Sequence, residues 1–179
     1  MNQDQNPHKL ILLRGNSGSG KTTLAHMLQH KLGRGTLVIS QDVIRRDMLW
    51  VHDKPGHPAI PLLINLVQYG RKNCRYVVLE GILFSETYEP LFRTIQSEYA
   101  PADIHAYYYD IPFEETLRRH ETKPNRADFG PEAMREWWKE KDYIGYLPEK
   151  ILTQTMTLED AAAQILTDIQ AQGMMEERK

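Results

Sequence analysis

A run of eight residues near the N-terminus has the composition and spacing of a phosphate-binding loop. The run is Gly15-Asn16-Ser17-Gly18-Ser19-Gly20-Lys21-Thr22, which fits the pattern G-x-x-x-x-G-K-[ST]. Because glycine lacks a Cβ, successive backbone N–H groups can turn inward toward phosphate oxygens. In this pattern the lysine ammonium reaches the β- and γ-phosphates, and the threonine hydroxyl ligates Mg²⁺. The run therefore predicts a site for a nucleoside triphosphate and Mg²⁺.

The segments on either side of this run have the patterns that a phosphate-binding loop requires. The apolar run 10–13 before it predicts a buried strand. Residues 22–32 after it predict a helix, with Leu24 and Leu28 on one face and its partly positive N-terminus toward the phosphates. A flexible Gly/Ser turn ahead of a lysine is the alternative, and strand, loop and helix in this order disfavour it. The residues predicted to contact the nucleotide are Gly15, Asn16, Ser17, Gly18, Ser19, Gly20, Lys21, Thr22, Thr23 and, from a later basic segment, Arg118.

Short apolar runs alternate with helical patterns along the rest of the chain. Strands are predicted at 36–39, 76–79, 104–109 and near 151–152. Helices are predicted at 43–50, 62–72, 88–99, from Pro112, from Pro131 through Trp138, and after the capping-box pattern Thr157-x-x-Asp160. Because the strands are almost continuously apolar, they favour a parallel sheet covered on both faces. The predicted fold class is α/β, in three layers.

Three carboxylates follow predicted strands, where ligands of a parallel sheet collect. They are Asp42, Glu80 and Asp110. We predict that Asp42 is the general base that accepts the proton of an attacking hydroxyl, with Arg45 and Arg46 binding a polar or anionic acceptor beside it. The alternative is that Asp42 only caps the following helix. Asp110 is expected to be a turn or cap residue.

Glu80 ends a strongly apolar strand and is followed by Gly81, where the backbone can approach a ligand closely. We predict that both residues contact the acceptor or the magnesium shell. Thr22 is the predicted metal ligand, with Asp42 or Glu80 completing the shell directly or through water. The alternative for Glu80 is a polar group that faces water at the end of a strand.

A basic segment after the fourth strand has the properties of an arginine-bearing lid over residues of about 118–135. Arginine from such a lid stabilises the charge that develops on a transferring phosphoryl group, and Arg119 and Arg126 are the predicted catalytic candidates. Surface pairs Glu114/Arg118 and Glu115/Arg119 are the alternative. Trp137 and Trp138 are expected to be packing groups rather than a stacking platform.

The composition favours a single soluble domain of 179 residues. A net charge of −2 gives no electrostatic reason to expect nucleic acid as a partner. Cys74 is the only cysteine, which excludes an intrachain disulfide and favours a reducing compartment. The histidines have no spacing typical of a zinc site, and no apolar run has the length of a signal peptide core or a membrane span. A cytoplasmic location is expected.

The chain resembles the P-loop kinases of the adenylate, shikimate and gluconate kinase type, and more loosely chloramphenicol phosphotransferase and the zeta-toxin kinases. Three segments carry the resemblance: 10–23 with the glycine-rich loop, 39–45 with an aspartate and an arginine, and 117–130 at the place of the lid. The resemblance implies a P-loop NTPase fold with a five-stranded parallel sheet in the order 2-3-1-4-5 and a small helical lid. It also implies an adenine site between the lid base and the loop near 153–155. Glu80 departs from the aspartate that many P-loop proteins have there.

These features together predict an ATP- and Mg²⁺-dependent kinase. Lys21 would hold the phosphates, Asp42 would orient the acceptor hydroxyl, and Arg119 or Arg126 would stabilise the transition state. The predicted acceptor is a small polar molecule: a sugar, a nucleoside-like compound or an antibiotic. Two alternatives stay open, namely a regulatory P-loop ATPase without transfer to a small molecule and a polynucleotide 5′-hydroxyl kinase. A GTPase is disfavoured because no Asn-Lys-x-Asp motif follows the fourth strand.

Overall fold

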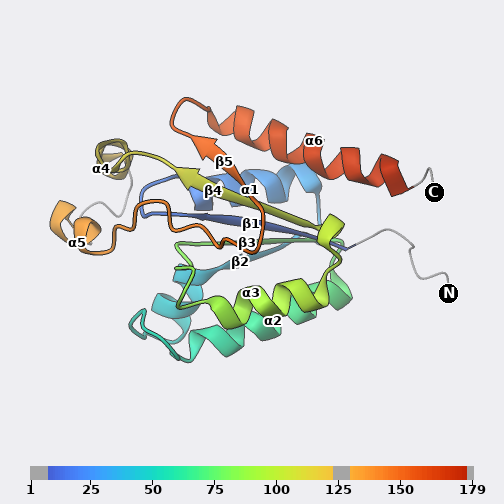
Figure 1. Cartoon of the computed structure of the whole chain (residues 1–179), viewed down its shortest axis with the longest axis horizontal. Helices are drawn as coiled ribbons and strands as arrows, with labels where there is room; N and C mark the ends of the chain where they lie inside the picture. The colour runs from blue at the N-terminus through green and yellow to red at the C-terminus, as the bar shows by residue number, and fades with distance from the viewer. Residues whose placement is uncertain (1–7, 123–129, 177–179) are drawn as a thin grey trace.

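The computed structural model describes residues 8–122 and 130–176, and these form a central sheet with helices on both faces (Figure 1). The five strands are all parallel and stand in the order β2-β3-β1-β4-β5. Their bounds are β1 Lys9–Gly15, β2 Leu37–Ser40, β3 Tyr76–Gly81, β4 Ile104–Asp110 and β5 Glu149–Thr153. The predicted fold class and strand order are confirmed.

The helices lie on both faces of the sheet and at its carboxyl end. Helices α2 and α3 cover one face, while α1 and α6 lie on the other, and α4 and α5 stand beyond the strand ends (Figure 1). Their bounds are α1 Lys21–Leu32, η1 Val43–Met48, α2 Ala59–Asn73, α3 Glu89–Glu98, η2 Pro101–Asp103, α4 Phe113–Glu121, α5 Pro131–Glu136 and α6 Leu158–Glu176. None of the helices in the described residues is long and apolar enough to cross a membrane.

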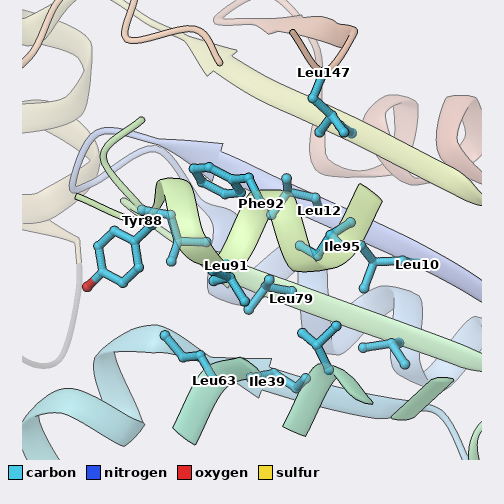
Figure 2. Close-up of a cluster of buried hydrophobic side chains, with 14 of the residues drawn as sticks. Leu10, Leu12, Ile39, Leu63, Leu79, Tyr88, Leu91, Phe92, Ile95 and Leu147 are labelled. Atoms are coloured by element: carbon cyan, nitrogen blue, oxygen red, sulfur yellow. The ribbon is translucent and has the colours of Figure 1, made fainter. Parts of the chain in front are cut away.

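Alternation along β1 divides the core into two layers. Leu10 and Leu12 join the core beneath α2 and α3, where Phe92 and Ile95 pack against them (Figure 2). The intervening side chains, such as Ile11, join the core beneath α1 and α6. A strand whose successive side chains enter opposite cores has no polar face, which explains why β1 is a continuous apolar run.

The segment predicted as a helix over 43–50 is a six-residue π-helix, η1, that ends at Met48. Its turns are closed by bonds such as Leu49 N–H to the Ile44 carbonyl at 3.1 Å. The helix stops because Trp50 takes a left-handed conformation with φ 49°, and the Val51 N–H then returns to the Arg45 carbonyl at 2.9 Å. The apolar spacing predicted a helix but carried no signal for this reversal.

Two helix ends test the sequence predictions in opposite ways. The Thr157 capping box is confirmed, since Thr157 N–H donates to Asp160 at 3.0 Å and Asp160 N–H donates to the Thr157 hydroxyl at 3.1 Å. The prediction that the helix from Pro131 runs through Trp138 is wrong, because α5 ends at Glu136. A bond from Trp138 N–H to the Arg135 carbonyl at 3.2 Å tightens the last turn and turns the chain away.

Candidate active site

The glycine-rich loop lies between β1 and α1, at the carboxyl end of the central strand. Gly18 has φ +82°, and a Cβ at this position would lie 2.5 Å from the Thr116 carbonyl oxygen in α4. Gly15 is equally crowded, since a Cβ there would lie 2.8 Å from the Cβ of Tyr109. The loop is thus packed directly against α4 and the end of β4. Only glycine allows both the conformation and the contact.

Lys21 is buried and its ammonium spans the loop. It donates to the Asn16 carbonyl at 2.9 Å and to the Ser19 hydroxyl at 3.2 Å. A lysine ammonium at a glycine-rich turn, whose backbone N–H groups can turn inward, is a donor set suited to triphosphate oxygens. The predicted phosphate-binding role of Gly15–Thr22 therefore fits the geometry, with the Lys21 ammonium at the centre of the loop.

The side chain of Asn16 holds the loop in place instead of pointing into it. Its amide donates to the Lys139 carbonyl at 2.7 Å, and its oxygen accepts from the Lys139 N–H at 3.0 Å. This bidentate pairing joins the loop to the segment after α5, which is 123 residues further along the chain. The sequence predicted contact between Asn16 and the nucleotide but carried no signal for this brace.

Glu80 joins the ends of β2 and β3 to the start of α1. Its carboxylate accepts from the Thr22 hydroxyl at 3.2 Å and from the Ser40 hydroxyl at 2.5 Å, and the residue is only 3% exposed. The alternative that Glu80 faces water is therefore wrong. One carboxylate with two hydroxyls is a hard oxygen set that suits Mg²⁺, which is held by few protein groups alongside phosphate and water. Among the described residues no cluster of three or more His, Cys, Asp or Glu offers a metal site of another kind.

Asp42 follows β2 and is paired with both predicted arginines. It accepts from Arg45 at 3.1 Å, and Arg46 Nε lies 3.3 Å from the same oxygen. The side chain of Asp42 remains 50% exposed and makes no capping hydrogen bond to η1. The structure therefore brings Asp42, Arg45 and Arg46 together and does not contain the cap that was the alternative role of Asp42.

A cleft of about 770 Å³ opens beside these arginines. Its walls come from η1, the turn that follows it, the β3–α3 connection and the end of α5. The described residues that line it are Arg45, Arg46, Trp50, Val51, His52, Asp53, Ile82, Phe84 and Trp137. The predicted acceptor residues Asp42, Glu80 and Gly81 are not among these lining residues. A Cβ at Gly81 would lie 2.6 Å from the Cβ of Gln41, so this glycine allows the end of β3 to pack closely against the residue that follows β2.

The arginines of α4 have different surroundings. Arg119 donates to the Ser19 carbonyl of the loop at 2.9 Å and to the Gln154 carbonyl at 3.3 Å. Arg118 is exposed and is held by Glu115 at 2.8 Å, so the predicted pair Glu114/Arg118 is wrong. The predicted pair Glu115/Arg119 is confirmed at 2.7 Å.

Hydrogen bonds from Arg118 and Arg119 lower the pKa of Glu115 to about 2, so this carboxylate stays charged at any ordinary assay pH. Of these two arginines of α4, Arg119 donates to the phosphate loop, whereas the described bonds of Arg118 go to Glu115. Arg126, the other predicted catalytic arginine, lies outside the described residues.

The two tryptophans after α5 also differ. Trp138 packs edge-on against Phe113 with ring centroids 5.2 Å apart, as a packing group does. Trp137 instead lines the cleft, with the Arg46 guanidinium 5.7 Å from its ring centroid. Phe113 and Trp138 also line a second hollow of about 660 Å³ together with the loop 153–155 that was implied as the adenine site.

Arg14 is a buried residue of the site's framework that the sequence analysis missed. It is fully buried at the end of β1 and donates to Asp142 at 2.9 Å, to Glu149 at 2.7 Å and to the Leu83 carbonyl at 2.9 Å. The β3–α3 connection and the segment before β5 are thereby held next to the loop. A charged residue at the end of an apolar strand, directly before the loop, was the signal that could have found it.

A second missed network lies behind the cleft. The Tyr88 hydroxyl donates to Asp53 at 2.8 Å and accepts from Gln41 at 2.7 Å, and His57 Nε2 lies 3.1 Å from the same hydroxyl. Figure 2 shows this hydroxyl pointing away from the labelled apolar side chains of the core. Burial lowers the pKa of His57 and raises the pKa of Tyr88. The network holds the Asp53 carboxylate at the wall of the cleft.

The model of the family described as AAA domain matches residues 10–140, which is more than half of the chain. The chain belongs to the AAA domain family. The matched region of this AAA domain includes the loop, Asp42, Glu80 and Arg119, and it ends before β5 and α6. No curated protein matches the chain.

Solved structures with the same fold include three small-molecule kinases. A gluconokinase from Sinorhizobium meliloti 1021 has a TM-score of 0.62 at 14% identity and covers 98% of this chain and 99% of its own. A shikimate kinase from Acinetobacter baumannii, in complex with shikimate, has a TM-score of 0.62 at 23% identity, covering 93% and 95%. The APS kinase CysC from Mycobacterium tuberculosis, in complex with AMPPNP and APS, has a TM-score of 0.60 at 21% identity, covering 92% and 99%. At these identities the likeness shows the P-loop kinase fold of this AAA domain.

Proposed function

We propose that the chain is an ATP- and Mg²⁺-dependent kinase that transfers the γ-phosphoryl group to a hydroxyl of a small polar acceptor, which would be a sugar, a nucleoside-like compound or an antibiotic. One observation carries the proposal: the short segment 40–46 contacts the phosphate site at its first residue and lines the cleft with its last two residues. Ser40 donates to Glu80 beside Thr22, and two residues later Asp42 accepts from Arg45, which lines the cleft. An acceptor in the cleft would therefore contact the arginines that hold Asp42, and Asp42 follows two residues after the Ser40 that contacts Glu80.

In the proposed reaction each group has a role that follows from its position. The loop amides and Lys21 bind the phosphates, and Asp42 accepts the proton of the acceptor hydroxyl. The acceptor oxygen forms a bond to the γ-phosphorus as the bond from that phosphorus to the β,γ-bridging oxygen breaks, which leaves ADP and a phosphate monoester. Thr22, Glu80 and Ser40 would hold Mg²⁺, which when bound neutralises charge on the phosphates.

Arg119 is the described arginine that the proposal assigns to the transferring group. Its guanidinium already lies 2.9 Å from the Ser19 carbonyl, so a small shift of a flexible side chain would bring it to the phosphates. We keep the segment 118–135 as a proposed lid and the chain as a single kinase domain. Because Cys74 is the only cysteine, a cytoplasmic location is part of the proposal.

The test is ATP turnover by the purified chain with Mg²⁺ and a panel of sugars, nucleosides and aminoglycoside-like or nucleoside antibiotics. We expect ADP release that rises only with an acceptor, together with a new phosphate monoester in ³¹P NMR spectra. ADP release that is independent of every acceptor would instead indicate the regulatory ATPase. Phosphate transfer to an oligonucleotide with a free 5′-hydroxyl, and to no small molecule, would indicate the polynucleotide kinase.

A further inference from the structure

The acceptor cleft has features that narrow the class of acceptor. We infer that the acceptor is an uncharged hydroxyl compound that carries a planar ring, and that Trp50 and Trp137 bind this ring. The inference rests on the proposed function for the transfer step, but the recognition of the ring stands on the cleft alone. Three observations support it: the backbone at Trp50, the second aromatic wall, and the pairing of the charges.

Trp50 is presented to solvent by an unusual backbone. The residue is 92% exposed, has φ 49° and lines the cleft. The left-handed conformation is disfavoured for a bulky L-residue, so the surrounding structure must impose it. Bonds from Leu49 N–H to Ile44 and from Val51 N–H to Arg45 do so on either side. The indole is held in water, and no ring contact with it is found among the described residues. A planar ring of a ligand would cover its apolar surface.

Half of the large apolar side chains that are exposed in the described chain belong to one short segment. Of the six large apolar side chains that are exposed in the described chain, Val43, Met48 and Trp50 lie within residues 43–50. Scattered exposed apolar residues need no explanation, but here three fall within one eight-residue segment, and its last residue, Trp50, lines the cleft.

Trp137 gives the cleft a second aromatic wall on a different element. It is half-buried, and the Arg46 guanidinium lies 5.7 Å from its ring centroid. Ile82 and Phe84 continue this wall from the β3–α3 connection. Aromatic and guanidinium planes bind planar rings by stacking, and saturated sugars offer them far less contact area.

The charges of the cleft do not favour an anionic acceptor. Arg45 and Arg46 line the cleft, yet both are paired with Asp42, and Asp53 lies 4.0 Å from Arg45. The two arginines are thus balanced by two carboxylates. An anion would compete with Asp42 for these two guanidinium groups and would also face Asp53. An uncharged acceptor meets neither cost.

The orientation that follows is compatible with transfer. With its ring between Trp50 and Trp137, the acceptor would direct its hydroxyl toward Asp42, which is adjacent in the chain to the cleft-lining segment. The hydroxyl proton goes to the Asp42 carboxylate, the hydroxyl oxygen bonds to the γ-phosphorus, and the β,γ-bridging oxygen leaves with ADP.

The experiment is isothermal titration calorimetry with the full chain, Mg²⁺ and a non-hydrolysable ATP analogue, using two matched sets of probes. One set is 4-nitrophenyl glucoside, methyl glucoside and 4-nitrophenyl glucuronide. The other is uridine, methyl riboside and uridine 5′-monophosphate. We expect at least one uncharged compound with a planar ring to bind at least tenfold more tightly than both its anionic counterpart and the methyl glycoside that lacks the planar ring.

The variants identify the residue responsible. Trp50→Leu should abolish the preference for the ring compound, Trp50→Phe should retain part of it, and both should bind the ATP analogue like the parent chain. Tyr69→Leu is the matched control, because Tyr69 is also an exposed aromatic residue but lies on α2 and does not line the cleft. It should change nothing.

Each failure has a separate meaning. Three results would overturn the inference. The methyl glycosides or the anionic probes could bind as tightly as the planar-ring compounds or more tightly, the preference could be unchanged in Trp50→Leu, or a chain that binds the ATP analogue could bind none of the probes. Trp50-dependent binding of a ring compound that yields no phosphate ester with ATP would leave the ring site standing and refute the kinase proposal. Phosphate ester formation at an equal KM with acceptors that lack a planar ring would support the kinase proposal and refute the ring site.

Discussion

The phosphate loop and the acceptor cleft lie at the same end of the sheet but are built in opposite ways. The loop is one contiguous run, Gly15–Thr22, whose central lysine is buried and whose Gly18 is packed against α4. The cleft is assembled from three separate segments and exposes the indole of Trp50 almost completely. Phosphate is recognised by backbone geometry, which a short run of sequence encodes. In the proposed function, the acceptor would be recognised by side chains that only the fold brings together.

The bracing of the two regions differs as well. Arg14 and Asn16 bind the loop to the segment between α5 and β5 through several hydrogen bonds shorter than 3 Å. On the cleft side, Arg45 is held mainly by Asp42 at 3.1 Å and by the Val51 carbonyl at 3.2 Å. We therefore expect substitutions at the loop to act on phosphate binding and stability, and substitutions at the cleft to act on the acceptor step.

The largest effect should come from Asp42→Asn, which tests whether the two regions meet at a general base. Loss of the proton acceptor should lower kcat by roughly 10²–10⁴-fold while binding of an ATP analogue is unchanged. Steady-state kinetics and calorimetry measure the two quantities. Asp47→Asn, an exposed carboxylate on the same π-helix, is the control and should be silent. Full turnover in Asp42→Asn would remove the general base from the mechanism.

Lys21→Met should have the next largest effect and should act on the phosphate side alone. Removing the buried ammonium to which the proposal assigns phosphate binding should reduce kcat by roughly 10²–10³-fold and weaken ATP binding. Acceptor binding in the cleft, measured by calorimetry without nucleotide, should persist. Lys31→Met, at the exposed end of α1, provides the comparison. An unaltered affinity for ATP in Lys21→Met would contradict the assigned role.

Gly18→Ala and Gly56→Ala compare the tightly packed phosphate loop with a glycine that has open space around it. Both glycines have positive φ, +82° and +74°, but only the Gly18 Cβ would meet backbone within 4 Å. Gly56→Ala should cost about 1 kcal/mol of unfolding free energy through its conformation alone. Gly18→Ala should cost about 3 kcal/mol, because overpacking against Thr116 is added. Chemical denaturation measures both, and equal losses would show that the loop can move away from α4.

The comparison of Arg119→Ala with Arg118→Ala should show the smallest effect among these four tests. Loss of a charged donor at the phosphate loop should lower kcat/KM by roughly 10–100-fold, from about 1.5–3 kcal/mol. Arg118→Ala removes only an exposed pair with Glu115 and should stay within about twofold. Equal losses in both variants would mean that the described contacts of Arg119 do not distinguish the two arginines in the working enzyme.

Much of the fold could be predicted because its signals are local. Five apolar runs and their intervening helical patterns placed the strands, and the glycine-rich loop placed the phosphate site. The π-helix at 43–48 could not be predicted, since its apolar spacing resembles that of an α-helix over so short a stretch. The end of α5 was misplaced for a similar reason, because Trp137 and Trp138 continue the pattern after the backbone has turned.

The candidate site was predicted in part. Asp42, Arg45 and Arg46 were expected to cluster, and they do so because they are neighbours on one turn. Glu80 was expected near the metal or the acceptor, and its contacts with Thr22 and Ser40 favour the metal. Three partnerships join residues far apart in the sequence and had no local signal: Asn16 with Lys139, Arg14 with Asp142 and Glu149, and Tyr88 with Asp53.

The sequence by itself determined the nucleotide side of this protein, because a phosphate loop needs only a strand, a few glycines, a lysine and a helix start in that order. The tertiary structure alone decided which arginine of α4 reaches the loop and which residues form the acceptor cleft. The first depends on how α4 packs against the loop, and the second on how η1, the β3–α3 connection and the end of α5 meet at the carboxyl edge of the sheet. Contacts between distant segments are set by packing of the whole chain, and Trp50 and Trp137 line the same cleft only because that packing is complete.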